Sequence, residues 1–386
     1  MQDDAEVSVP ATCLHNDAQL PPPVDEDDLS PEELARAARK RLMRGRIITT
    51  VGIVILSFDT PTFRFIRTQA PPGNDIAQGL AATVWRGFCY CLAGVFVLRL
   101  ESSSIEQLRT AFRDLGVRRL LFCTITLAGS NTCFPIAVAL TTATNVLVIL
   151  AMMPLACALM SRAIGVKLPL HTWLAAGVAC IAVALCFASG IQAGPQQVKG
   201  CILALAAMIM FGSFVTMGSF SGAVSCVPAM PLAGVLSICI CFAGLGPRWH
   251  YATPYDRADG GFLMLNGLTN AVANVMVVVG TQSVPSTEVS LIGLLETALG
   301  PVLTYLVTLN RPQGPEVPDT KSIAAGCIIV SVLVIHTLVD VRIARRAHAK
   351  ELTSEDSVCA SDLQAQAAGL PSTESAADLL GGEPAQ

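Results

Sequence analysis

Residues 141–163 read TTATNVLVILAMMPLACALMSRA, and residues 285–309 read PSTEVSLIGLLETALGPVLTYLVTL. Both stretches have a Thr- or Ser-rich start, continue as an apolar run and carry a proline, Pro154 in the first and Pro301 in the second. After a polar loop, each is followed by a further apolar run that begins Ala-Ala-Gly, at 175–177 and at 324–326. A helix pair that recurs in both halves of an apolar chain indicates a duplicated membrane bundle, which is typical of secondary transporters.

The composition favours a membrane protein. Of the 386 residues, 52% are hydrophobic and 14% are charged, whereas soluble domains carry about a quarter charged residues. Apolar windows of about 20 residues, long enough to cross about 30 Å of hydrocarbon, predict about ten membrane spans. These windows are 47–65, 77–98, 120–140, 143–163, 170–190, 200–220, 227–246, 262–281, 289–309 and 322–341. Because period-two alternation is absent, we expect an all-α membrane protein rather than a β-barrel.

The spans divide into two halves of five. An odd number of spans per half inserts the second half upside down relative to the first, so we expect two inverted five-helix repeats, at 46–190 and 199–341. The flanking tails are 1–45, a disordered stretch followed by a basic helix, and 342–386, a second disordered stretch. Lys and Arg are more frequent in the tails and loops on the side of the N-terminus. This asymmetry predicts a multi-pass protein with both termini in the cytosol.

Ionisable side chains inside spans are costly and are therefore candidates for function. Arg86 lies near the middle of its span and needs a partner, for which Asp59, Glu296 and an anionic substrate are the candidates. A structural ion pair and a substrate contact both remain open for Arg86. Glu296 lies a third of the way into its span. Because desolvation favours the protonated form of a carboxylate, Glu296 can bind a proton or a cationic group, with a buried structural hydrogen bond as the alternative.

Amides and prolines complete the candidate site. Asn270 and Asn274 share one helix face because they are four residues apart. A single asparagine can join two helices by a hydrogen bond, but Asn131, Asn145, Asn270 and Asn274 in comparable spans predict a polar cavity. Pro154 and Pro301 are predicted hinges, since proline releases backbone from the helical ladder and suits a discontinuous helix beside a binding site.

These segments resemble a known family. The run 141–145 (TTATN) through Met153-Pro154-Leu155 resembles the first-half signature of EamA-type transporters of the drug/metabolite transporter superfamily. The run 284–291 (VPSTEVSL) followed by 295–301 (LETALGP) resembles the second-half signature, and Asp59 and Arg86 resemble polar residues of the family's first two spans. The resemblance implies two inverted repeats and alternating access around a central cavity. The first half lacks a counterpart of Glu296, since Ala, Met and Met occupy 151–153.

We therefore expect a secondary transporter that moves a small organic metabolite, by proton coupling or by exchange. A nucleotide-sugar or phosphate-ester antiporter of the same superfamily ranks lower because it would need more basic groups than Arg86 in the cavity. A non-transporting receptor or scaffold is the third alternative. The spans show no nucleophile–base pair and no metal cluster, so we expect no catalytic residues, no bound metal and no cofactor. The expected partners are a small-molecule substrate and the lipid bilayer but no nucleic acid, and a homodimer is left open, as is the choice between plasma membrane and endomembrane.

Overall fold

The computed structural model describes residues 31–66, 68–69, 73–101, 109–110, 112–113, 115–165, 194–220 and 225–309, together with separate helical residues within 174–184 and 320–342. The chain divides into two compact units, Met1–Arg44 and Gly45–Gln386. Of the first unit, the described part is the basic beginning of a helix. Most of the predicted span at 170–190, half of that at 322–341, most of the N-terminal tail and nearly all of the C-terminal tail lie outside the described residues.

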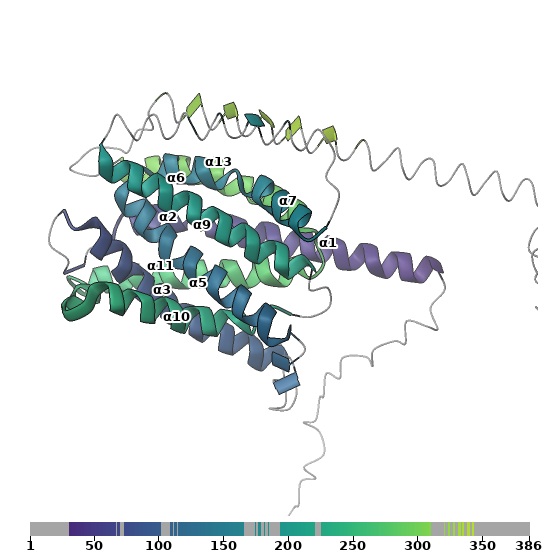
Figure 1. Cartoon of the computed structure of the whole chain (residues 1–386), viewed down its shortest axis with the longest axis horizontal. Helices are drawn as coiled ribbons and strands as arrows, with labels where there is room; N and C mark the ends of the chain where they lie inside the picture. Colours follow the sequence, from purple (N-terminus) through teal and green to yellow (C-terminus); the bar gives the residue numbers. More distant parts are fainter. Residues whose placement is uncertain are drawn as a thin grey trace, which may run out of the picture. The chain divides into compact units, whose positions relative to one another are not determined.

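The described elements are helices, shown in Figure 1. Apart from an isolated bridge between Thr68 and Pro254, no strand pairing occurs in the described ranges. In chain order the helices are α1 (Pro31–Leu56), α2 (Asp59–Phe63), α3 (Asp75–Glu101), α5 (Val117–Leu140), α6 (Ala143–Leu150), α7 (Met153–Ala163), α9 (Pro195–Phe220), α10 (Ala229–Leu245), the 3₁₀ helix η2 (Gly246–Ala252), α11 (Arg257–Thr281), α12 (Ser286–Ile292) and α13 (Leu294–Thr308).

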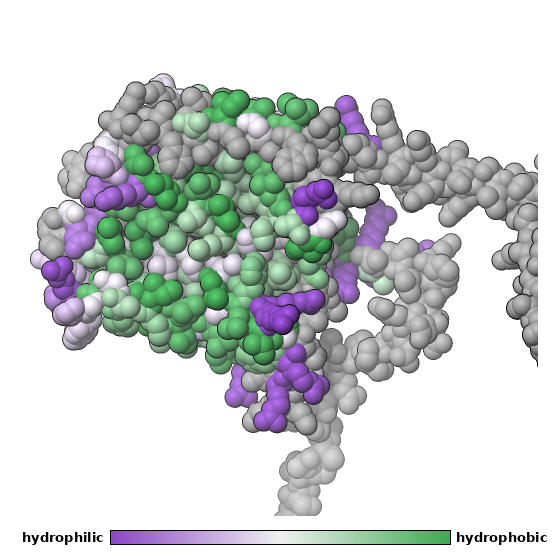
Figure 2. Space-filling view, viewed as in Figure 1, coloured by the Kyte–Doolittle hydropathy of each residue, from purple (hydrophilic) through white to green (hydrophobic). Residues whose placement is uncertain are grey.

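The fold is that of a helical membrane protein. Seven stretches of the described chain are helical, long enough and apolar enough to cross a bilayer, and each overlaps one of the predicted spans. They are Asp75–Leu100, Val117–Leu140, Ala143–Ala163, Pro195–Phe220, Ala229–Ala252, Arg257–Thr281 and Glu288–Thr308. Large apolar side chains such as Phe96 (63% exposed) and Leu121 (55% exposed) point outwards. Figure 2 shows one such face, apolar over most of its area with hydrophilic side chains gathered towards two ends.

The predicted span at 47–65 is divided, for which Pro61 provides the reason. Proline lacks an amide hydrogen, and its ring clashes with the carbonyl four residues earlier, which here belongs to Ser57. Helix α1 accordingly ends at Leu56, and the short helix α2 begins at Asp59 after a two-residue turn. The turn places the carboxylate of Asp59 at the start of a helix inside the bundle, where it is buried.

The two predicted hinges differ in position. Pro154 would clash with the carbonyl of Leu150, and α6 ends at that residue; after a turn at 151–152, α7 begins with Pro154 in its first turn. In the second copy the interruption falls at Gly293, whereas Pro301 lies well inside α13. The interruption and the proline therefore coincide in the first copy only.

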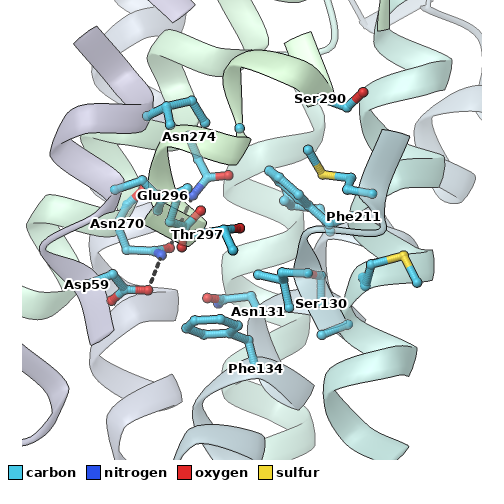
Figure 3. A pocket seen from close by; sticks show the side chains of 18 of the residues that line it. Asp59, Ser130, Asn131, Phe134, Phe211, Asn270, Asn274, Ser290, Glu296 and Thr297 are labelled. Carbon is cyan, nitrogen blue, oxygen red and sulfur yellow. Dashed lines mark hydrogen bonds between the residues drawn. The ribbon is translucent and has the colours of Figure 1, made fainter. Parts of the chain in front are cut away.

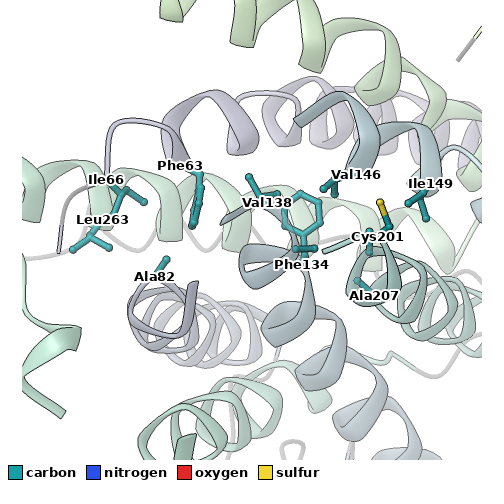
Figure 4. Close-up of a cluster of buried hydrophobic side chains, with 12 residues drawn as sticks. Phe63, Ile66, Ala82, Phe134, Val138, Val146, Ile149, Cys201, Ala207 and Leu263 are labelled. Carbon is teal, nitrogen blue, oxygen red and sulfur yellow. The ribbon is translucent and has the colours of Figure 1, made fainter. Parts of the chain in front are cut away.

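Close backbone contacts hold the bundle together. A methyl group on Gly87 of α3 would lie 2.8 Å from the carbonyl oxygen of Gly234 on α10, and one on Gly234 would lie 2.5 Å from the carbonyl oxygen of Gly87. Small residues of this kind let membrane helices approach until their backbones touch. A buried apolar cluster fills the space between α2, α3, α5, α6, α9 and α11, with Phe134 near its centre in Figure 4.

We expect Gly234→Ala to destabilise the protein, because the added methyl group would meet backbone that cannot rotate away. The cost of such overpacking is about 1–3 kcal/mol. Gly261→Ala is the matched control, since nothing lies within 4 Å of a methyl group there. Thermal unfolding in detergent should show a lower midpoint for Gly234→Ala alone, and equal midpoints for the two variants would contradict the close contact.

Candidate ligand cavity

A cavity with about 720 Å³ of empty space, solvent at its mouth included, lies inside the second unit. Its walls come from α1, α2, α3, α5, α6, α7, α9, α11, α12 and α13, so both predicted halves contribute. Six of the residues predicted to bind or couple line it, namely Asp59, Arg86, Asn131, Asn270, Asn274 and Glu296. Figure 3 shows how these side chains, apart from Arg86, approach one another from different helices. The arrangement is a mostly apolar pocket with a few polar groups, which is the usual form of a small-molecule site.

Asp59 and Arg86 form a buried ion pair. The Nη2 group of Arg86 on α3 donates to Oδ1 of Asp59 on α2, and both side chains are 1% exposed. The Nε group of Arg86 donates to Oδ1 of Asn266 at 2.9 Å, and its guanidinium carbon lies 5.4 Å from the centre of the Phe134 ring. Of the three partners proposed for Arg86, the structure therefore provides Asp59.

Amides on α11 satisfy the carboxylate of Asp59. Asn266 donates to Oδ1 of Asp59 at 2.7 Å, and Asn270 donates to Oδ2 at 2.9 Å. Tyr90 on α3 in turn donates to Oδ1 of Asn270 at 2.8 Å. Because a buried charge is tolerated when its partners are also satisfied, this network fixes α2, α3 and α11 relative to one another.

Glu296 lines the same cavity without such hydrogen-bonding partners. It occupies the first turn of α13 and is 8% exposed. Its backbone amide donates to the carbonyl of Gly293, but its carboxylate takes part in no hydrogen bond or ion pair with another described residue. A buried carboxylate that faces a cavity and lacks a fixed donor is a functional candidate.

The remaining amides separate into two groups. Asn131 on α5 donates to Ser237 at 3.3 Å, and Asn274 donates to the carbonyl of Asn270 at 2.9 Å. The side-chain oxygens of Asn131 and Asn274 have no donor among the described residues. Asn145 does not line the cavity. Its side chain donates to Thr141 at 3.3 Å, at the N-terminal end of α6, where the Thr142 hydroxyl accepts from its backbone amide.

Sequence reasoning missed two members of the network, Asn266 and Tyr90. Both could have been found from helical spacing. Asn266 lies four residues before Asn270 and eight before Asn274, and Tyr90 lies four residues after Arg86, so each shares a helix face with a residue already chosen. Neither carries a charge, and uncharged polar residues are common enough in membrane helices that this spacing alone singles out few of them.

The described cavity lining contains three charged side chains, those of Asp59, Arg86 and Glu296. The described residues contain no group of three His, Cys, Asp or Glu side chains that could hold a metal ion. The described lining offers carboxylate and amide oxygens as acceptors beside apolar and aromatic walls. Of these lining residues Arg86 alone is basic, and Asp59 already neutralises it. The site is therefore better suited to a ligand that donates hydrogen bonds than to one that carries negative charge.

Comparison with known proteins shows a similar fold but indicates no activity. The sequence matches no family model and no curated protein. Nine chains of solved structures match. One of them, described as "Crystal structure of protein", is similar with a TM-score of 0.51 and 16% sequence identity, over 76% of this chain and 97% of that one. At this identity the similarity shows a shared fold alone.

We expect Arg86→Met to destabilise the protein strongly, because it leaves the carboxylate of Asp59 buried without its cation. Breaking a buried ion pair in this way costs about 3–5 kcal/mol. Arg46→Met is the matched control, since Arg46 pairs with Glu288 where both side chains are partly exposed, and loss of an exposed pair costs about 0–1 kcal/mol. Chemical unfolding gives the free energy of unfolding of wild type, of both single variants and of the double variant Asp59→Asn/Arg86→Gln. The double variant should recover part of the loss, and a cost for Arg86→Met no larger than that for Arg46→Met would contradict the assignment.

Proposed function

We propose that this protein is a secondary transporter of the EamA type, within the drug/metabolite transporter superfamily, which moves a small organic metabolite by alternating access. The observation that carries the proposal is a cavity between membrane-length helices with buried ionisable groups on its walls. Ionisable groups inside a membrane bundle mark substrate or ion pathways. The proposal includes about ten spans with both termini in the cytosol, as the distribution of Lys and Arg predicts.

The pattern of helix contacts supports an inverted repeat. We compare α1–α2, α3, α5 and α6–α7 with α9, α10, α11 and α12–α13. An internal two-fold axis then relates several contacts in pairs, although the contact of α3 with α5 has no equally extensive counterpart between α10 and α11. Helix α3 packs on its own counterpart α10, and the interrupted helices meet as α6 with α13 and α7 with α12. The contact of α5 with α9 has its counterpart in α11 with α1, where a methyl group on Gly52 would lie 2.9 Å from Met276. The contacts of α3 with α11 and of α10 with α5 form a further pair. Transporters built in this way place the substrate at the repeat interface.

Two polar contacts connect the α1–α2 run to the interrupted helices. Within the run, Arg46 in the second half of α1 forms an ion pair with Glu288 in the first turn of α12, with 3.2 Å between Nη2 and Oε2. At its end, Arg64 donates to the carbonyl of Thr141, just before α6, at 3.1 Å. Contacts of this kind can break at one end while they hold at the other, which is what alternating access requires.

Glu296 would provide the coupling. A carboxylate without a fixed partner can hold a proton in one state and a substrate in another, so either proton coupling or exchange can run through it. A nucleotide-sugar or phosphate-ester antiporter is the weaker candidate, because Arg86 is neutralised by Asp59 and the described cavity lining offers no other cation to a phosphate group. A receptor or scaffold would use the same cavity without moving its ligand.

The transport proposal is tested with the purified full chain in proteoliposomes loaded with a cell-derived metabolite extract. Mass spectrometry should show a small group of metabolites that leaves faster than from protein-free vesicles, and Glu296→Gln should slow this efflux at least about tenfold if one charge-assisted contact is lost. Asp75→Asn is the control, because it makes the same chemical change in the first turn of α3, outside the cavity lining. Efflux equal to that of protein-free vesicles for every metabolite would reject transport and favour a receptor or scaffold.

We expect Glu288→Arg to open the end of the cavity next to Arg46, because it replaces an ion pair with two like charges. The measurement is the rate at which a membrane-impermeant thiol reagent modifies Ser290→Cys, a buried lining position two residues further along α12. The rate for the same protein with Ser290 intact is subtracted. The rate should rise in Glu288→Arg and return in Arg46→Glu/Glu288→Arg. An unchanged rate in Glu288→Arg would contradict a gating role for this pair.

A further inference from the structure

The charges that face the cavity do not balance. Three charged residues line its described part, two acidic and one basic. Arg86 and Asp59 neutralise each other through a direct contact, and Asn266 and Asn270 occupy further hydrogen-bonding positions of the pair. The carboxylate of Glu296 is left over. A ligand that enters the cavity therefore meets one acidic group that forms no direct ion pair with a described residue.

The unsatisfied amide atoms in the described lining are also acceptors. The side-chain oxygens of Asn131 and Asn274 are buried without a donor, while the amide nitrogens of both residues are already used. Leaving a buried acceptor unpaired costs about 1–3 kcal/mol. The two amide oxygens therefore favour a ligand that supplies N–H groups. Figure 3 shows Asn131, Asn274 and Glu296 around the same space.

Apart from Tyr90 and the hydroxyl residues Ser130, Ser290 and Thr297, the rest of the wall is apolar. Aliphatic side chains and Phe211 surround the polar groups, and they include Ile53, Leu127, Leu150, Met153, Met208 and Leu294. Apolar walls of this kind exclude a small, fully hydrated cation such as Na⁺ and favour a ligand with an apolar body. A dication would leave one of its charges without a partner, because the described part offers a single unpaired carboxylate.

We propose that the substrate is a monovalent amphipathic organic cation, whose ammonium group pairs with Glu296 and donates to the carbonyl oxygens of Asn131 and Asn274 while its apolar body contacts α1, α5 and α9. This assignment rests on the transport function proposed above and names the class of ligand. A primary ammonium group provides three N–H donors and no acceptor, which matches the three acceptors of the site. The Asp59–Arg86 pair takes no direct part in ligand binding and holds α2, α3 and α11 in place around it.

The test uses three probes of similar size that differ in charge: 2-phenylethylamine, 2-phenylethanol and 3-phenylpropanoate. Titration calorimetry with the full chain in nanodiscs should give the tightest binding for the amine, by about ten- to a hundredfold over the alcohol, because a hydrogen bond to a charged group is lost. Glu296→Gln should lower the affinity for the amine by a similar factor and change that for the alcohol little. Asp75→Asn should leave all three affinities unchanged, and the unfolding midpoint of Glu296→Gln shows that the variant is folded.

Three results would overturn the assignment: no binding of the amine at millimolar concentration, equal or tighter binding of the alcohol or the carboxylate, and full amine affinity in Glu296→Gln. Flux measurements on the same purified protein in proteoliposomes separate failure of this assignment from failure of the transport proposal. Amine binding without flux of any metabolite would reject transport and retain the ligand class. Flux of an uncharged metabolite that does not depend on Glu296 would retain transport and reject the ligand class.

Discussion

The ion pair between Asp59 and Arg86 is the constraint on which the rest of the structure depends. A single charge in a membrane bundle is costly, and these two charges remain there because they satisfy each other and because Asn266, Asn270 and Tyr90 complete the hydrogen bonds around them. The pair joins α2 to α3, and its amide partners join both to α11. Arg86 is the one basic residue of the described cavity lining, and this pair already uses it. The charged residue that is left for a ligand, Glu296, is therefore acidic.

Interrupted helices make room for this chemistry. Pro61 ends α1 and turns Asp59 inwards, and the interruption before Pro154 and the one at Gly293 bring Met153, Gly293 and Glu296 to the cavity wall. Irregular backbone inside a membrane is tolerated where it faces protein or a cavity, because its polar groups find partners there. The interruptions in the helices therefore place the polar groups at the cavity.

Hydropathy predicted the helical membrane fold, and seven of the spans coincide with membrane-length helices of the described chain, because apolar length is a property of the local sequence. Charge cost likewise selected Asp59, Arg86 and Glu296, all of which line one cavity. The pairing of Arg86 with Asp59 rather than Glu296 could not be predicted, since it depends on how α2 and α13 are rotated. For the same reason Asn145 was expected in the cavity but lies at the start of α6, and Pro301 was expected at an interruption that occurs at Gly293. Rotation and register come from packing between helices, which sequence spacing does not encode.

The central claim is that Arg86 is committed to Asp59, which leaves Glu296 as the charge that a ligand meets. The most direct measurement is the ratio of the affinities for 2-phenylethylamine and 3-phenylpropanoate in wild type and in Asp59→Asn/Arg86→Gln. The double variant removes both members of the ion pair and keeps Glu296. The account predicts that the double variant still prefers the amine, because Glu296 and the side-chain oxygens of Asn131 and Asn274 remain. Loss or reversal of that preference in the double variant would show that the ion pair itself contacts the ligand, and would contradict the account.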